Sequence, residues 1–182
     1  PNGPVSRAMT AVLAGTVETA VNALWDAGPL VGDRVAVVGF GIIGSLVARL
    51  LSLMPAVEVV VFEKMETRRE AASRLGFQLA PQPSSHSAIQ PSNHFDLTFH
   101  TSGTAEGLQQ CIEMVGIEGR VVELSWYGLK EVQVSLGGSF HIGRKQIISS
   151  QVSNIPAARS ARWDRQRRKA AVAVQQLVHS QH

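Results

Sequence analysis

The run VAVVGFGIIGSLVARLL, residues 35–51, joins an apolar segment to a helical pattern through three closely spaced glycines. The stretch RVAVVG (34–39) is a continuous run rich in valine, typical of a strand buried on both faces of a parallel sheet. From Ile42 onward, apolar residues return at helical spacing. A strand that feeds a helix through G-x-G-x-x-G is the fingerprint of a dinucleotide-binding βαβ unit, so this feature constrains the fold strongly.

Each glycine of the turn has a separate physical role in this interpretation. Gly39 permits the tight turn, Gly41 lets a pyrophosphate approach the backbone, and Gly44 lets the helix lie close to the strand. The first N–H groups of the helix, at Ile42 and Ile43, point toward the same pyrophosphate together with the positive end of the helix dipole. A tight strand–helix turn without a ligand is the alternative.

Glu63 ends the second expected strand, nineteen residues after Gly44, where the fingerprint places an acid for the ribose hydroxyls. A carboxylate accepts hydroxyl hydrogen bonds and repels the 2′-phosphate of NADP, so we predict a preference for NAD. Lys64, Arg68 and Arg69 follow closely and leave two alternatives open. They contact a 2′-phosphate, or they lie on the outer face of the next helix while Glu63 is a solvated strand end.

Strand and helix patterns alternate along the rest of the chain, which predicts a single doubly wound α/β domain with a parallel sheet, the Rossmann type. We expect helices over 7–27, 42–54, 67–76, 105–115 and 163–178, and strands over 34–39, 57–63, 95–100, 119–126 and 145–152, with a weak strand near 77–79 and a loop over 81–94.

Composition excludes several classes of protein. Cys111 is the single cysteine among 182 residues, which rules out an intrachain disulfide framework and a cysteine-built zinc site. No apolar run approaches the roughly 20 residues of a membrane span, and no signal peptide opens the chain. The net charge is only +3, and six of the 17 Lys and Arg residues fall within 159–169. We expect a cytoplasmic protein without nucleic-acid or membrane partners, whose basic stretch is a solvated helix start or contacts another domain.

Four stretches resemble the nucleotide-binding domain of the medium-chain, zinc-type alcohol dehydrogenases: LAGTVETAVNALWDAG, VGDRVAVVGFGIIGSLVARLL, FDLTFHTSGTAEGLQQCIEMVGIEGRVVELSWYG and KQIISSQV. The resemblance covers about residues 10–155. It implies a linking helix over 1–28 and a dinucleotide-binding domain over 29–155, and the remaining residues, 156–182, form a separate basic helical segment in this interpretation. It also implies NAD as cofactor, hydride transfer to or from an alcohol or aldehyde, and a homodimer paired through an edge of the sheet.

In that family a separate chaperonin-like domain carries the catalytic zinc and precedes the nucleotide-binding domain. This chain begins at Pro1, and its cysteine and histidines show no ligand spacing, each histidine being a surface or packed residue instead. We therefore expect a segment of a two-domain enzyme that contains neither the zinc nor catalytic residues and is inactive alone. The alternative is a non-catalytic NAD(H)-sensing or scaffold module.

The resemblance also assigns polar residues at the ends of later strands to the cofactor. Thr101, Ser102 and Gly103 would lie near the adenosine ribose, and Ser125, Trp126 and Tyr127 near the nicotinamide. Ser149, Ser150 and Gln151 would approach the carboxamide, and Thr16 and Thr19 would face the nicotinamide from the linking helix. The alternative is that the serines and threonines cap helices and turns, while Trp126 and Tyr127 cover the rim of the sheet.

Overall fold

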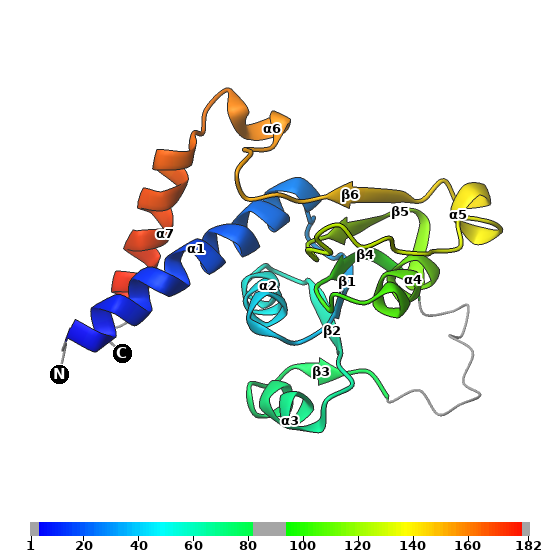
Figure 1. The fold of residues 1–182 in the computed structure, drawn as a ribbon, viewed down its shortest axis with the longest axis horizontal. Helices are drawn as coiled ribbons and strands as arrows, with labels where there is room; N and C mark the ends of the chain where they lie inside the picture. Colours follow the sequence, from blue (N-terminus) through cyan, green and yellow to red (C-terminus); the bar gives the residue numbers. More distant parts are fainter. Residues whose placement is uncertain (1–3, 82–93, 180–182) are drawn as a thin grey trace.

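The computed structural model describes residues 4–81 and 94–179, and the side chains of 15–81 and 94–172. Its described part contains a parallel sheet in the order β3-β2-β1-β4-β5-β6, with helices on both faces (Figure 1). The strands are β1 Arg34–Val38, β2 Glu58–Phe62, β3 Gln78–Leu79, β4 Phe95–His100, β5 Val115–Glu123 and β6 Gln146–Ser149. The predicted doubly wound sheet is confirmed, including the short strand near 77–79.

The helices are α1 Pro4–Ala27, α2 Ile42–Ser52, α3 Glu66–Arg74, α4 Ala105–Met114, α5 Ser139–Ile142, α6 Ala157–Ser160 and α7 Arg165–His179. Alternate residues of each strand supply two separate cores. In β1, Val35 and Val37 pack with α1 and α2, whereas Ala36 and Val38 pack with α4. This two-sided burial explains why the strands read as continuous apolar runs.

Several predicted boundaries were wrong. The strand expected over 119–126 is β5, which starts directly after α4 at Val115 and ends at Glu123. The β4–β5 register shifts between Phe95 and Leu97, which accommodates the early start. The strand ends early because the Ser125 N–H donates to the Glu123 carboxylate, at 2.6 Å, rather than to a ladder partner. The strand expected over 145–152 is limited to β6, and the last helix begins at Arg165 rather than at 163. Most of the predicted loop, residues 82–93, lies outside the described residues.

The C-terminal segment folds back so that α7 lies beside α1 (Figure 1). Arg168 of α7 is fully buried and donates hydrogen bonds to the Asn22 side chain and the Val152 carbonyl, and it lies 3.4 Å from Glu18. The expectation of a solvated or domain-contacting basic stretch is therefore wrong for this residue. Within the described ranges, no helix has both the length and the apolar character required to cross a membrane.

Candidate functional site

The sheet reverses its winding at β1, which pairs with β2 on one side and with β4 on the other. The segments that leave these strands meet there. The Gly39 N–H donates to the Phe62 carbonyl at 2.8 Å, and the Thr101 hydroxyl donates to the Gly39 carbonyl at 2.9 Å. A crevice at this switch point, beyond the carboxyl ends of the strands, is where open α/β sheets bind ligands.

The three glycines of the turn differ in what a side chain would meet. At Gly39, φ is +98° and a Cβ would lie 2.9 Å from the Ser102 backbone, so both conformation and space require glycine. At Gly44, a Cβ would lie 2.0 Å from the Gly39 carbonyl oxygen. At Gly41, φ is −79° and the nearest atom, at 3.9 Å, is the end of Arg68. The fold itself therefore requires Gly39 and Gly44, whereas the space beside Gly41 is open.

Helix α2 begins at Ile42, directly after Gly41 and the open space beside it. Its N-cap residue is Gly41, which offers no side-chain acceptor to the first N–H groups of the helix, including those of Ile42 and Ile43. The positive end of the helix dipole lies at the same place. Such a helix start binds an anionic group, with phosphate as the usual example.

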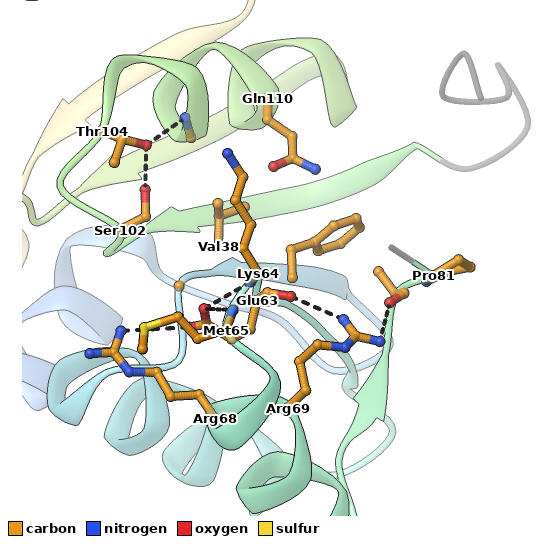
Figure 2. A pocket seen from close by; sticks show the side chains of 14 residues that line it. Val38, Glu63, Lys64, Met65, Arg68, Arg69, Pro81, Ser102, Thr104 and Gln110 are labelled. Carbon is orange, nitrogen blue, oxygen red and sulfur yellow. Dashed lines mark hydrogen bonds and ion pairs between the residues drawn. The ribbon is translucent and has the colours of Figure 1, made fainter. Parts of the chain in front are cut away.

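A pocket of about 250 Å³ opens beside the turn (Figure 2). The last residues of β1 and β2, residues that follow β1 to β4, and residues of α3 and α4 line it: Val38, Gly39, Phe62, Glu63, Lys64, Met65, Arg68, Arg69, Ala80, Pro81, Ser102, Thr104, Gly107 and Gln110. The structure thus brings Gly39, Glu63, Lys64, Arg68 and Ser102, all predicted from sequence, to one cavity. Thr104 and Gln110 line it as well and were missed by the sequence analysis.

The Glu63 carboxylate is already engaged by the backbone around it. Oε2 accepts a hydrogen bond from the Phe40 N–H at 2.6 Å, and Oε1 accepts from the N–H groups of Lys64 and Met65, both at 2.8 Å. Burial alone would raise the pKa of Glu63. The three N–H donors and the Arg68 guanidinium, 3.8 Å away, outweigh it and hold the pKa below its usual range.

The two arginines of α3 occupy different places in the pocket wall. Arg69 donates to the carbonyl oxygens of Glu63 and Ala80, at 3.0 and 3.2 Å, so its guanidinium braces the ends of β2 and β3. Arg68 is half exposed, and its guanidinium extends past Met65 toward the open space beside Gly41 (Figure 2). Of the two cations, Arg68 is therefore the one that could meet a ligand.

The residues assigned to the nicotinamide side fall into separate groups. Ser125 and Tyr127 lie near His100, whereas Trp126 is 88% exposed. Ser150, which follows β6, donates its hydroxyl to Asp26 of α1 at 2.6 Å, so this hydroxyl is already engaged. The Thr19 hydroxyl donates to the Gly15 carbonyl within α1. Ser149 lies at the end of β6, and none of these residues lines the pocket.

His100 and Glu123 form a polar pair that the sequence analysis did not identify, since it treated His100 only as a surface or packed residue. They are register partners at the last positions of β4 and β5. His100 is fully buried, and its Nδ1 lies 2.8 Å from a Glu123 oxygen, while its Nε2 lies 2.8 Å from the Ser102 hydroxyl. The available signal was two polar residues, each of which directly follows apolar residues at the end of its strand.

The described residues offer no set of ligands for a metal ion. Among the side chains of residues 15–81 and 94–172, no three His, Cys, Asp or Glu are grouped in a way that could hold one. Cys111 is fully buried in α4, and that burial raises the pKa of its thiol. The structure thus provides no zinc centre within these ranges.

A doubly wound sheet with a glycine turn at its switch point defines a dinucleotide-binding type of α/β domain. The family model of the zinc-binding dehydrogenases matches residues 43–166, and the chain belongs to this family.

Two curated relatives are dehydrogenases. L-idonate 5-dehydrogenase (NAD(P)(+)) of Escherichia coli is 26% identical over 133 residues, which is 66% of this chain and 39% of that protein. D-guloside 3-dehydrogenase of Shigella flexneri is 25% identical over 163 residues, which is 86% of this chain and 47% of that protein. The chain thus spans less than half the length of these relatives.

A putative zinc-binding dehydrogenase from Sinorhizobium meliloti, solved bound to NADP, has a similar fold. Its TM-score is 0.72 at 20% identity, over 91% of this chain and 48% of the other. At this identity the similarity establishes the fold.

Proposed function

We propose that the chain is the NAD(H)-binding part of a zinc-type alcohol or aldehyde oxidoreductase. The observation that carries this proposal is the geometry at Gly41. The fold does not require glycine there, yet a glycine leaves open the space in front of the uncapped start of α2. A pyrophosphate needs such an approach to the backbone. The pocket of about 250 Å³ beside it is the proposed site of the adenosine.

The proposed contacts extend the sequence assignment. Ile42 and Ile43 would bind the pyrophosphate through their backbone N–H groups, and the pocket residues Glu63, Lys64, Arg68 and Ser102 would surround the adenosine ribose. Thr101 and Gly103 adjoin this ribose. Ser125, Trp126, Tyr127, Ser149, Ser150 and Thr19 remain proposed contacts of the nicotinamide half. A bound nicotinamide cofactor supplies hydride transfer, and this chain's own residues hold and orient it.

We further propose that the zinc and most of the substrate pocket belong to a separate domain. Support comes from the relatives, which are dehydrogenases of more than twice the length matched here. The linking helix would then be residues 1–28, and the substrate a small alcohol or aldehyde. A non-catalytic NAD(H)-sensing module is the competing proposal.

Titration calorimetry with NADH, on the wild-type chain and on Gly41→Val, tests the cofactor site. We expect saturable binding of NADH that Gly41→Val weakens, and a wild-type chain that binds neither NADH nor NADPH overturns the proposal.

Alcohol-dependent reduction of NAD, measured with added zinc, tests the division into domains. We expect no turnover by this chain, and zinc-dependent turnover would contradict a separate catalytic domain. The coding sequence upstream of Pro1 separates the two proposals: zinc ligands in a preceding domain support the enzyme, and an adjacent start codon supports the sensor.

A further inference from the structure

Ser102, His100 and Glu123 form a continuous chain of hydrogen-bonded side chains at the ends of β4 and β5. The Ser102 Oγ lies 2.8 Å from the His100 Nε2, and the His100 Nδ1 lies 2.8 and 2.9 Å from the two Glu123 oxygens. A hydroxyl in contact with a base that a third group orients is the arrangement that activates a nucleophile.

The chemistry of the three groups sets the direction of the hydrogen bonds. An ionised Glu123 can only accept, so the His100 Nδ1–H donates to it. The Nε2 of the neutral imidazole then carries a free lone pair and accepts the Ser102 hydroxyl proton. The Ser125 N–H donates to Glu123 Oε1 at 2.6 Å, and the Tyr127 hydroxyl donates to Oε2 at 3.3 Å. These two donors hold the carboxylate toward the imidazole.

Gly107 of α4 provides the space for the serine–histidine contact. A Cβ at Gly107 would lie 2.1 Å from the Ser102 Oγ and 2.9 Å from the His100 Nε2. Any larger residue would therefore displace one of the two groups. Thr104, the N-cap of α4, contributes a second hydroxyl 3.2 Å from the Ser102 Oγ.

The histidine and the serine differ in solvent access. His100 is fully buried, so its imidazole cannot swing away to water. Ser102 is exposed and lines the pocket of about 250 Å³, with Thr104 and the first turn of α4 next to it (Figure 2). The positive end of the α4 dipole favours negative charge that develops near this hydroxyl. A small carbonyl compound in the pocket could thus reach the serine.

We propose that Ser102 is a nucleophile, with His100 as its general base and Glu123 as the positioning residue, and that this site cleaves small carboxylic esters. The Ser102 Oγ bonds to the ester carbonyl carbon while its proton passes to the His100 Nε2. The carbon–oxygen bond to the alcohol breaks, and the alcohol leaves with that proton. Water then cleaves the acyl-serine, which releases the carboxylic acid and restores the hydroxyl. This activity goes beyond the proposed cofactor role and requires no cofactor.

The test uses the full 182-residue chain without cofactor, a fluorophosphonate probe and p-nitrophenyl acetate. Peptide mass spectrometry should find the probe on Ser102, and ester hydrolysis should exceed that of Ser102→Ala by about 100-fold or more. His100→Gln and Glu123→Gln should slow labelling of Ser102, the former by about 100-fold. Ser73→Ala, at an exposed position of α3, is the matched control and should behave as wild type.

Mass spectrometry of the wild-type chain decides the proposal without depending on any variant fold. A probe that fails to label Ser102, or that labels it at the same rate in a folded His100→Gln chain, overturns it. Equal rates of ester hydrolysis by wild type and Ser102→Ala would also overturn the proposal. Gly107→Ala adds an independent test, because the added methyl group should separate Ser102 from His100. Labelling of Ser102 should then be lost, while the helix content measured by circular dichroism stays that of wild type.

Discussion

The Glu63 carboxylate accepts a 2.6 Å hydrogen bond from the backbone N–H of Phe40, in the middle of the glycine turn. The acid that ends β2 therefore holds the turn that ends β1, across the strand pair whose register joins Val38 to Phe62. If Glu63 binds the hydroxyls of a ribose, the same carboxylate must also hold this turn. The carboxylate has acceptor capacity for both, because two oxygens offer about four lone-pair sites and three N–H groups use three of them.

Gly41→Val and Gly44→Ala should separate binding from folding. Gly41→Val should keep the wild-type melting temperature and lose about tenfold or more in NADH affinity, about 1.4 kcal/mol, because its side chain would fill the open space. Gly44→Ala should lower the melting temperature, because its Cβ would lie 2.0 Å from the Gly39 carbonyl oxygen. Calorimetric titration and thermal unfolding measure the two effects. Wild-type affinity in Gly41→Val would show that the pyrophosphate lies elsewhere.

NADH should bind more tightly than NADPH by about tenfold or more, because the 2′-phosphate brings about −1.5 to −2 charges against the Glu63 carboxylate. Glu63→Ser should reduce or invert this preference for NADH over NADPH, since Lys64 and Arg68 remain at the pocket. Glu66→Ser removes a carboxylate at the start of α3 and serves as the control. Calorimetry on one preparation measures both affinities, and equal affinities of the wild-type chain for NADH and NADPH would contradict the predicted preference.

Glu63 should also make the stability of the fold sensitive to acid. The pKa of Glu63 is lower in the folded chain than its ordinary value of 4.5. The ionised carboxylate therefore stabilises the fold fully above pH 4.5, and this stabilisation is lost as the pH falls through the pKa of the folded state. Glu63→Gln should destabilise the chain at pH 7 by about 1–3 kcal/mol. The difference from wild type should shrink below about pH 4. Urea unfolding at several pH values measures this, and a difference that is constant from pH 7 to pH 3 would contradict the shift.

Arg168 should anchor the C-terminal helix to the rest of the domain. Arg168→Met leaves the Glu18 carboxylate, which is only 8% exposed, without its cation, and should cost about 3–5 kcal/mol of unfolding free energy. The Arg168→Met/Glu18→Gln double variant should recover part of this loss. Arg165→Met, at the exposed start of α7, is the control. Denaturant unfolding of these three variants and of wild type measures the loss and its partial recovery, and an unchanged Arg168→Met chain would exclude the anchoring role.

The chain should form a homodimer through β6, which is the outer strand of the described sheet. Its outer backbone groups have no neighbouring strand there, and Ile147 adds an exposed apolar side chain. Ile147→Lys should shift the chain toward monomer in sedimentation equilibrium, whereas Leu75→Lys, at the exposed residue that follows α3, should not. A wild-type chain that stays monomeric at high concentration would argue against pairing through this edge.

Local features of the sequence were sufficient to predict the alternating strands and helices, the glycine turn and the position of Glu63. These depend on residues a few positions apart, whose spacing directly reflects strand and helix geometry. The predicted residues after β1, β2 and β4 meet at one pocket because parallel strands end at the same edge. Boundaries were less accurate, as for β5, because backbone hydrogen bonds such as that from Ser125 to Glu123 decide where a strand ends.

Only the tertiary structure decided which distant side chains meet. The pairing of His100 with Glu123 depends on the order and register of β4 and β5, and the burial of Arg168 against Glu18 depends on how α7 packs on α1. A polar residue in an apolar segment can face solvent or a buried partner, and local periodicity does not distinguish the two. The cost of burying an unpaired polar group selects the partnered arrangement, and that cost is set by the assembled fold.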